Sequence, residues 1–185
     1  MSSASSVIDF DTFDPRRNLP SAVGRKRGES NYAAAFARAF VTDRAGKGVG
    51  GRHFAVPGYG IADFLWVDTS DSASSPMLTA FEMKLKDWKK ALGQAYRYSY
   101  FADHAVVVLP PGSIGRARAN MNVFRKMGIG LWSFDATSET IDTIHHPRTC
   151  KPRNGNAKEK AVALLRRRSK FRNLFEQSDA VAKSG

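Results

Sequence analysis

Two acidic residues and one lysine interrupt two segments of the chain that are otherwise apolar. Asp63 lies within the segment 60–65, and Glu82 and Lys84 lie within the segment 80–85. If both segments are strands, alternation places Glu82 and Lys84 on one face and their apolar neighbours on the other. Pairing of the two strands would bring Asp63 across from Glu82 at the spacing of neighbouring strands, roughly 5 Å. The pattern therefore predicts two carboxylates and an ammonium in one polar patch.

Two carboxylates at this distance repel each other, and a hard divalent cation is the simplest group that removes the repulsion. Mg²⁺, with Mn²⁺ as the second choice, takes carboxylate oxygens and keeps several of its waters. Such an ion lowers the pKa of a bound water and stabilises charge on a phosphoryl oxygen, while Lys84 can orient or deprotonate the attacking water. These residue types indicate hydrolysis of a phosphodiester. Zinc is disfavoured because the patch holds no thiolate or imidazole cluster.

The elements that must position this patch follow from the spacing of apolar residues. An amphipathic helix is expected over 30–42 and another over 87–101, with Asp87 as the N-cap of the second. A Val-rich run at 105–109 is typical of a strand buried on both faces and is expected at the centre of the sheet. The other patterns predict strands at 53–56, 61–67, 78–85, 129–134 and 140–144, a helix at 114–127, and a glycine-rich break at 46–51.

The predicted order of elements is α-β-β-β-α-β-α-β-β. A meander pairs its strands antiparallel, whereas a helix between two strands usually returns the chain so that they pair in parallel. Both connections occur in this order. The fold class is therefore α/β, with a mixed β-sheet flanked by helices.

The chain resembles the PD-(D/E)XK nuclease superfamily, whose members share the restriction-endonuclease-like fold. The resemblance rests on Asp63, followed after eighteen residues by Glu82-Met83-Lys84. It also rests on the α-β-β-β-α-β order over residues 29–109. The resemblance implies that Asp63, Glu82 and the carbonyl of Met83 bind the metal and that Lys84 is the catalytic lysine. The residue before Asp63 is Ala62 where the family name has proline, a departure that many members share.

Three further residues extend the resemblance. Many members carry a Gln-x-x-x-Tyr on the next helix, and Gln94 and Tyr98 match it at a spacing that puts both on one helix face. Some members also place a glutamate on the first helix facing the metals, and Glu29 at the start of the 30–42 helix is similar. The resemblance thus adds these three to the catalytic residues and Glu29 to the metal ligands, although an acidic residue in a first turn also serves simply as a helix cap.

The charge of the chain favours a polyanionic partner. Lys and Arg number 29 against 17 Asp and Glu, which gives a formal charge of +12 and an isoelectric point near 10.1. A surface that follows a phosphate backbone is expected near the polar patch, and the resemblance favours DNA over RNA. The expected nucleic-acid-binding residues are Lys86, Lys89, Lys90, Arg97, Arg116 and Arg118.

The organisation along the chain is expected to be one domain with two basic ends. Residues 1–28 are predicted to form a loosely ordered basic arm, 29–148 the nuclease-like domain, and 149–185 a basic tail with a helix over 157–175. The single cysteine, together with the lack of a signal peptide or an apolar anchor, predicts a cytoplasmic protein with no membrane partner. The resemblance allows a homodimer where two strands must be cut.

These observations predict a Mg²⁺-dependent endodeoxyribonuclease, and two other classes remain open. One is a nucleic-acid-binding module that keeps the fold without cleaving, and the other is an RNA-associated basic protein. The acidic pair and lysine could also be a solvated face with an exposed ion pair. A G-x-G-x-x-G match at 46–51 lies in the wrong context for dinucleotide binding, and His145, His146 and Cys150 lack the fourth ligand of a zinc site.

Overall fold

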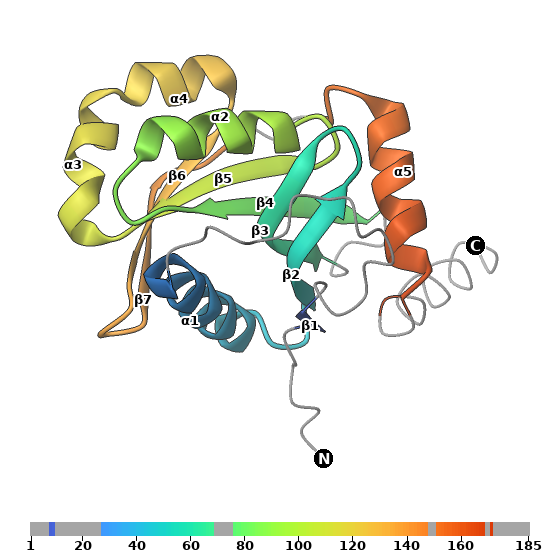
Figure 1. Ribbon diagram of the computed structural model, residues 1–185, viewed down its shortest axis with the longest axis horizontal. Coiled ribbons are helices and arrows are strands. Elements are labelled where there is room, and N and C mark those ends of the chain that lie inside the picture. The colour runs from blue at the N-terminus through green and yellow to red at the C-terminus, as the bar shows by residue number, and fades with distance from the viewer. Residues whose placement is uncertain (1–7, 10–26, 69–75, 148–150, 169–170, 172–185) are drawn as a thin grey trace.

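The chain folds as an open mixed β-sheet with helices on both faces, which confirms the predicted α/β class (Figure 1). A computed structural model describes residues 8–9, 27–68, 76–147, 151–168 and 171. In these ranges the six main strands are β2 Gly48–Val56, β3 Gly60–Asp68, β4 Met77–Met83, β5 His104–Leu109, β6 Gly130–Asp135 and β7 Thr140–His145. The helices are α1 Arg27–Asp43, α2 Trp88–Tyr98, α3 Pro111–Ala119, α4 Met121–Met127 and α5 Gly155–Arg166.

The strands lie in the sheet in the same order as in the chain. β2, β3 and β4 form an antiparallel meander, and β4, β5 and β6 are parallel, with α2 and then α3 and α4 as the crossovers. β7, expected as a strand at 140–144, pairs antiparallel with β6 and forms an edge of the sheet. A two-residue strand β1, Ile8–Asp9, pairs in parallel with β2 within the segment expected to be loosely ordered. The expected order over 29–109 is thus the observed one.

An aromatic layer fills the space between α1 and one face of the sheet. Phe36 and Phe40 of α1 pack against Phe81 of β4 with ring centroids 5.2 and 5.1 Å apart. Phe64 of β3 and Phe134 of β6 also contact Phe36. The opposite face carries α2, α3 and α4 over a second apolar core, and α5 packs beside the β2–β3 hairpin (Figure 1). The sheet is therefore buried on both sides, as the near-continuous apolar run in β5 requires.

The glycine-rich break expected at 46–51 is wrong, because most of that segment belongs to β2. Gly48 and Gly50 lie against two aromatic rings of β3, and a Cβ built on them would lie 2.7 Å from Trp66 and 2.6 Å from Phe64. The glycines are therefore strand residues whose missing side chains make room for these rings.

The single helix expected over 114–127 is also wrong. α3 begins earlier, with Pro111 in its first turn, where a missing N–H costs nothing. Asn120 then leaves the helical conformation (φ −110°, ψ 30°), and its side-chain amide donates to the carbonyl of Arg116. Asparagine competes in this way with the backbone ladder, so the chain forms two short helices.

Two other element ends differ from expectation. β4 ends at Met83, so Lys84 follows the strand, although its N–H still donates to the carbonyl of Val108 at 3.3 Å. In the C-terminal segment α5 ends at Arg166, and its buried residues are Ala157, Ala161 and Leu165, which the sequence did not point to. Phe171, beyond the end of α5, is also buried. The other expected helix positions beyond residue 171 lie outside the described residues. No helix in the described ranges is long and apolar enough to cross a bilayer.

The glycines of β2 give a stability prediction. Gly50→Ala should lower the free energy of unfolding by about 1–3 kcal/mol, because the buried Phe64 ring has no free space in which to move away. Gly93→Ala is the matched control, since nothing lies within 4 Å of the added methyl group on α2 and the helix should gain about 0.5–1 kcal/mol. Urea unfolding measures both, and equal effects from the two substitutions would contradict this account.

Candidate active site

The acidic pair meets where the β3–β4 ladder ends. Phe64 pairs with Phe81 in this ladder. Asp63 is the residue before Phe64, and Glu82 is the residue after Phe81. The backbone N–H of Met83 donates to Asp63 Oδ2 at 2.8 Å. Both carboxylates are buried, with Asp63 2% and Glu82 0% exposed. The alternation of β4 explains the burial, because it turns Phe81 and Met83 into the α1 core and Glu82 to the opposite face.

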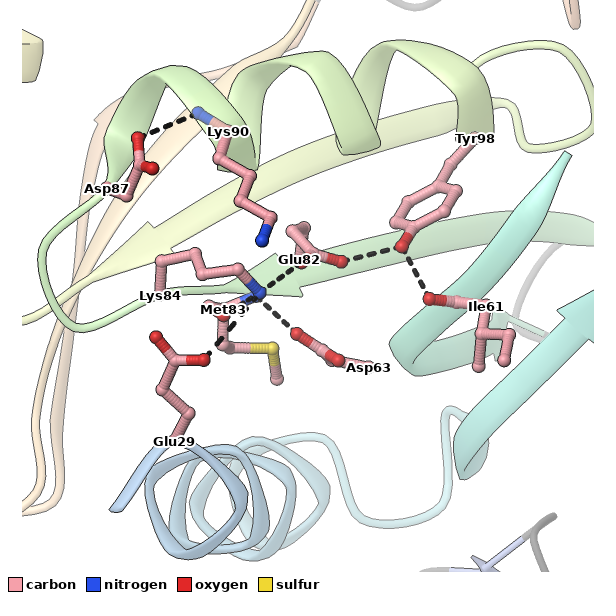
Figure 2. Close-up of polar contacts among 9 residues, drawn as sticks. All are labelled: Glu29, Ile61, Asp63, Glu82, Met83, Lys84, Asp87, Lys90 and Tyr98. Carbon is pink, nitrogen blue, oxygen red and sulfur yellow. Dashed lines mark hydrogen bonds and ion pairs between the residues drawn. The ribbon is translucent and has the colours of Figure 1, made fainter. Parts of the chain in front are cut away.

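The lysine closes this cluster (Figure 2). Lys84 Nζ donates to Glu82 Oε1 at 2.6 Å and to the carbonyl of Met83 at 3.2 Å. It also lies 4.0 Å from Glu29 Oε2, so the first turn of α1 comes to the site from the other side of the sheet. The structure thus brings together the four charged residues that the sequence analysis assigned to catalysis. The exposed-ion-pair interpretation is wrong for Asp63, Glu82 and Lys84, because all three are buried.

Tyr98 also reaches the site, from the last turn of α2. Its hydroxyl lies 2.6 Å from Glu82 Oε2 and 2.5 Å from the carbonyl of Ile61, and its single proton can satisfy only one of these acceptors. A proton on Glu82 would let the carboxyl donate to the hydroxyl and the hydroxyl donate to the carbonyl. Gln94 lies one turn earlier, and its buried amide oxygen makes no hydrogen bond within the described part of the chain. Of this pair, only Tyr98 is seen bonded to the acidic cluster.

The cluster holds protons more tightly than its members would in water. Burial, and then the charge of Asp63, raise the pKa of Glu82 to about 7. Burial alone would lower the pKa of Lys84, but the charges of Glu82, Asp63 and Glu29 outweigh it and the pKa is raised. The two shifts differ in their main cause, because burial raises the pKa of Glu82 whereas the neighbouring carboxylates raise that of Lys84. Lys84 is therefore a cation at neutral pH in this arrangement.

The oxygens of the cluster fit a hard divalent cation. The available donors are the carboxylates of Asp63 and Glu82 and the carbonyl of Met83, all of the kind that Mg²⁺ prefers. A divalent cation would also relieve the repulsion between Asp63 and Glu82, which adds to the effect of burial on the pKa of Glu82. Across the residues that the structure describes, no three Asp, Glu, His or Cys side chains are grouped so that they could hold a metal ion together, so waters would have to complete the coordination. The Lys84 ammonium takes two of the candidate oxygens, so a metal would have to compete with it.

The basic residues expected to bind nucleic acid are all exposed. Asp87 caps α2 as predicted, with its carboxylate accepting from the N–H of Lys90 at 3.0 Å. The Lys90 side chain extends from this first turn toward the acidic cluster (Figure 2). Lys86 and Lys89 are close to Lys90 in the sequence, at the start of α2. Arg97 lies on the last turn of α2, and Arg116 and Arg118 lie on α3.

Two residues of β2 that the sequence did not point to lie next to the site. His53 lies opposite Asp63 in the β2–β3 register and is buried, and its φ of 56° is left-handed, which is unusual for a residue other than glycine. Arg52 donates to the carbonyl of Ser30 at 3.4 Å, which connects β2 to the start of α1 beside Glu29. Neither feature has a local sequence signal, because both depend on the pairing of distant segments.

Comparison with known proteins gives no family for this chain. No family model matches the sequence, and no curated protein matches it significantly.

The raised pKa of Glu82 gives a pH prediction. The folded protein binds this proton more tightly than the unfolded chain, so without metal the free energy of unfolding should fall as the pH rises from about 4.5 to about 7. Protons and Mg²⁺ compete for the same carboxylate, so the rise in Tm caused by a fixed Mg²⁺ concentration should be larger at pH 8 than at pH 6.

Thermal unfolding at both pH values, with and without Mg²⁺, measures this effect. Glu82→Gln should make the rise in Tm with Mg²⁺ the same at both pH values, because an amide does not titrate. Asp142→Asn, on the exposed face of β7, is the matched control and should keep the larger rise at pH 8. An Mg²⁺ effect on the wild type that is equal at the two pH values would show that Glu82 is not a ligand.

Proposed function

We propose that this protein is a metal-dependent nuclease that hydrolyses phosphodiester bonds in DNA, with the restriction-endonuclease-like fold of the PD-(D/E)XK superfamily. One observation carries the proposal. Asp63, Glu82 and Lys84 are buried together beside the carbonyl of Met83, at the end of an antiparallel meander that is followed by a helix and a parallel strand. A buried cluster of this kind is costly to fold and indicates a functional site.

Each residue of the cluster has a distinct role in this proposal. Asp63, Glu82 and the Met83 carbonyl would hold Mg²⁺ or Mn²⁺, and Glu29 lies at the more exposed side, with 22% of its side chain accessible. The bound metal would supply an activated water and stabilise charge on the phosphoryl oxygen. Lys84, held as a cation by its carboxylate neighbours, suits orientation of the water and stabilisation of negative charge better than proton removal. Tyr98 fixes the orientation of Glu82.

The charge of the protein supports a nucleic acid substrate. The net charge of +12 is accompanied by exposed lysines on the first turn of α2, and Lys90 extends toward the cluster. Cations placed in this way suit phosphates on either side of a scissile bond.

One observation favours a second candidate, a nucleic-acid-binding module that does not cleave. The 2.6 Å bond between Lys84 and Glu82 already neutralises part of the acidic cluster without any metal. In that case the cluster would be a structural ion pair inside a DNA-binding protein, and binding would not depend on Mg²⁺.

Cleavage of labelled duplex, branched and single-stranded DNA and RNA with Mg²⁺, Mn²⁺ or EDTA tests the proposal. The wild type should cut at least one DNA substrate in a metal-dependent way. Asp63→Asn and Lys84→Ala should each reduce the rate by about a hundredfold or more, since each removes a metal ligand or a charge from the reacting centre. A wild-type protein that binds these substrates and cuts none with either metal would favour the binding module.

The lysines of α2 give a separate prediction for binding. Lys90→Ala should weaken DNA binding without sequence preference and reduce the slope of log K against log salt by about one. Arg44→Ala is the matched control, because it removes the same charge roughly 20 Å from Glu29, beyond the far end of α1. Salt titrations of DNA binding compare the two variants. An equal slope of log K against log salt for both would show that Lys90 does not contact the DNA phosphates.

A further inference from the structure

Three tyrosines and an arginine form a continuous series beside the β2–β3 turn, outside the acidic cluster. The ring of Tyr59 lies 5.7 Å from that of Tyr100 at an angle of 31°, and Tyr100 lies edge-on to Tyr96 at 6.0 Å. The guanidinium of Arg153 lies 4.8 Å from the centre of the Tyr96 ring. All three rings are partly exposed. We call these four residues the tyrosine ladder.

The tyrosine ladder and the acidic cluster are built on the same elements. Tyr96 and Tyr98 are two residues apart near the end of α2, and Tyr98 bonds Glu82 and the carbonyl of Ile61. Tyr59 occupies the turn that leads into β3, four residues before Asp63. At ~3.3 Å per residue this separation is about 13 Å along the strand, which corresponds to about four nucleotides at a rise of ~3.4 Å. One nucleic acid strand can therefore reach both.

The polar contacts of the tyrosine ladder hold it in place. Arg153 donates from Nε to Ser99 Oγ at 3.0 Å and from Nη2 to the carbonyl of Met127 at 3.0 Å. The side-chain amide of Asn154 donates to the hydroxyl of Tyr59 at 3.1 Å. The arginine is exposed and has no carboxylate among these partners, so its positive charge is available to a phosphate.

Aromatic faces combined with a fixed cation are the features that bind unpaired nucleobases. Stacking of a base on an aromatic side chain contributes about 1–3 kcal/mol and tolerates any sequence, and arginine adds cation–π and phosphate contacts. A base pair inside a duplex is stacked on both faces, so it has no face free for a side chain. Tyr59 also packs against the core and accepts a hydrogen bond from Asn154, but among the described residues Tyr96 and Tyr100 accept no such bond and keep partly exposed rings at the surface.

We infer that the tyrosine ladder binds unpaired bases, so the substrate of this site is DNA with a single-stranded arm next to the bond that is cut, rather than a blunt duplex. The inference rests on the proposed nuclease function for the position of the cut. Base stacking itself does not depend on cleavage, so it can be measured separately.

Binding of a forked DNA that carries 2-aminopurine in its unpaired arm, measured in EDTA, tests the inference. The wild type should quench the fluorescence at one or more arm positions and should bind the fork more tightly than a blunt duplex of the same length. Tyr96→Leu and Tyr100→Leu should weaken fork binding by about fivefold or more and leave duplex binding unchanged. Tyr96→Phe is the matched control and should bind like the wild type, since it keeps the ring.

Two results would overturn the inference: no quenching by the wild type at any arm position, or an equal loss of fork and duplex binding in the leucine variants. Thermal unfolding of each variant checks that α5 remains docked, and the wild-type quenching stands as evidence where a leucine variant does not fold. Quenching without metal-dependent cleavage of any substrate would support the tyrosine ladder and reject the nuclease. Cleavage of a blunt duplex without quenching would reject the tyrosine ladder alone.

Discussion

The burial of Asp63, Glu82 and Lys84 is the constraint on which the rest of the structure depends. Removing an ion from water costs several kcal/mol even after relaxation, so each charge must find partners that are already in place. The N–H of Met83 meets Asp63, the hydroxyl of Tyr98 meets Glu82, and Lys84 bonds Glu82 and a backbone carbonyl. These partners come from β4 and α2, which fixes how the first crossover must pack.

The same strand residues connect the site to the core. In β4, Phe81 and Met83 enter the aromatic layer under α1, while Glu82 between them faces the opposite side of the sheet. A slip of one residue in the pairing with β3 would exchange these faces and place a carboxylate among phenylalanine rings. The packing energy of Phe64 and Phe81 therefore holds the register that sets Asp63 against Glu82. Stability of the core and geometry of the site are two consequences of one alignment.

The parts of the fold and site that the sequence predicted are those with a strong local period. Alternation in β4 and the expected pairing of β3 with β4 were enough to place Asp63 beside Glu82, and the Val-rich run identified β5 as central. The glycines of β2 were misinterpreted because their role depends on the rings of Trp66 and Phe64 in another strand. The left-handed His53 and the tyrosine ladder likewise arise from contacts between distant segments, which no local pattern records.

A positive charge at the centre of the cluster is required whether or not a metal is bound. Lys84 Nζ bonds Glu82 Oε1 and the Met83 carbonyl, and these two oxygens are also candidate metal ligands. Each of these oxygens has a second lone pair, so a metal would either share them with the ammonium or displace it. With lysine alone, burial and then the charge of Asp63 raise the pKa of Glu82. A divalent ion would offset the repulsion between Asp63 and Glu82, so the same repulsion that contributes to the raised pKa of Glu82 favours metal binding.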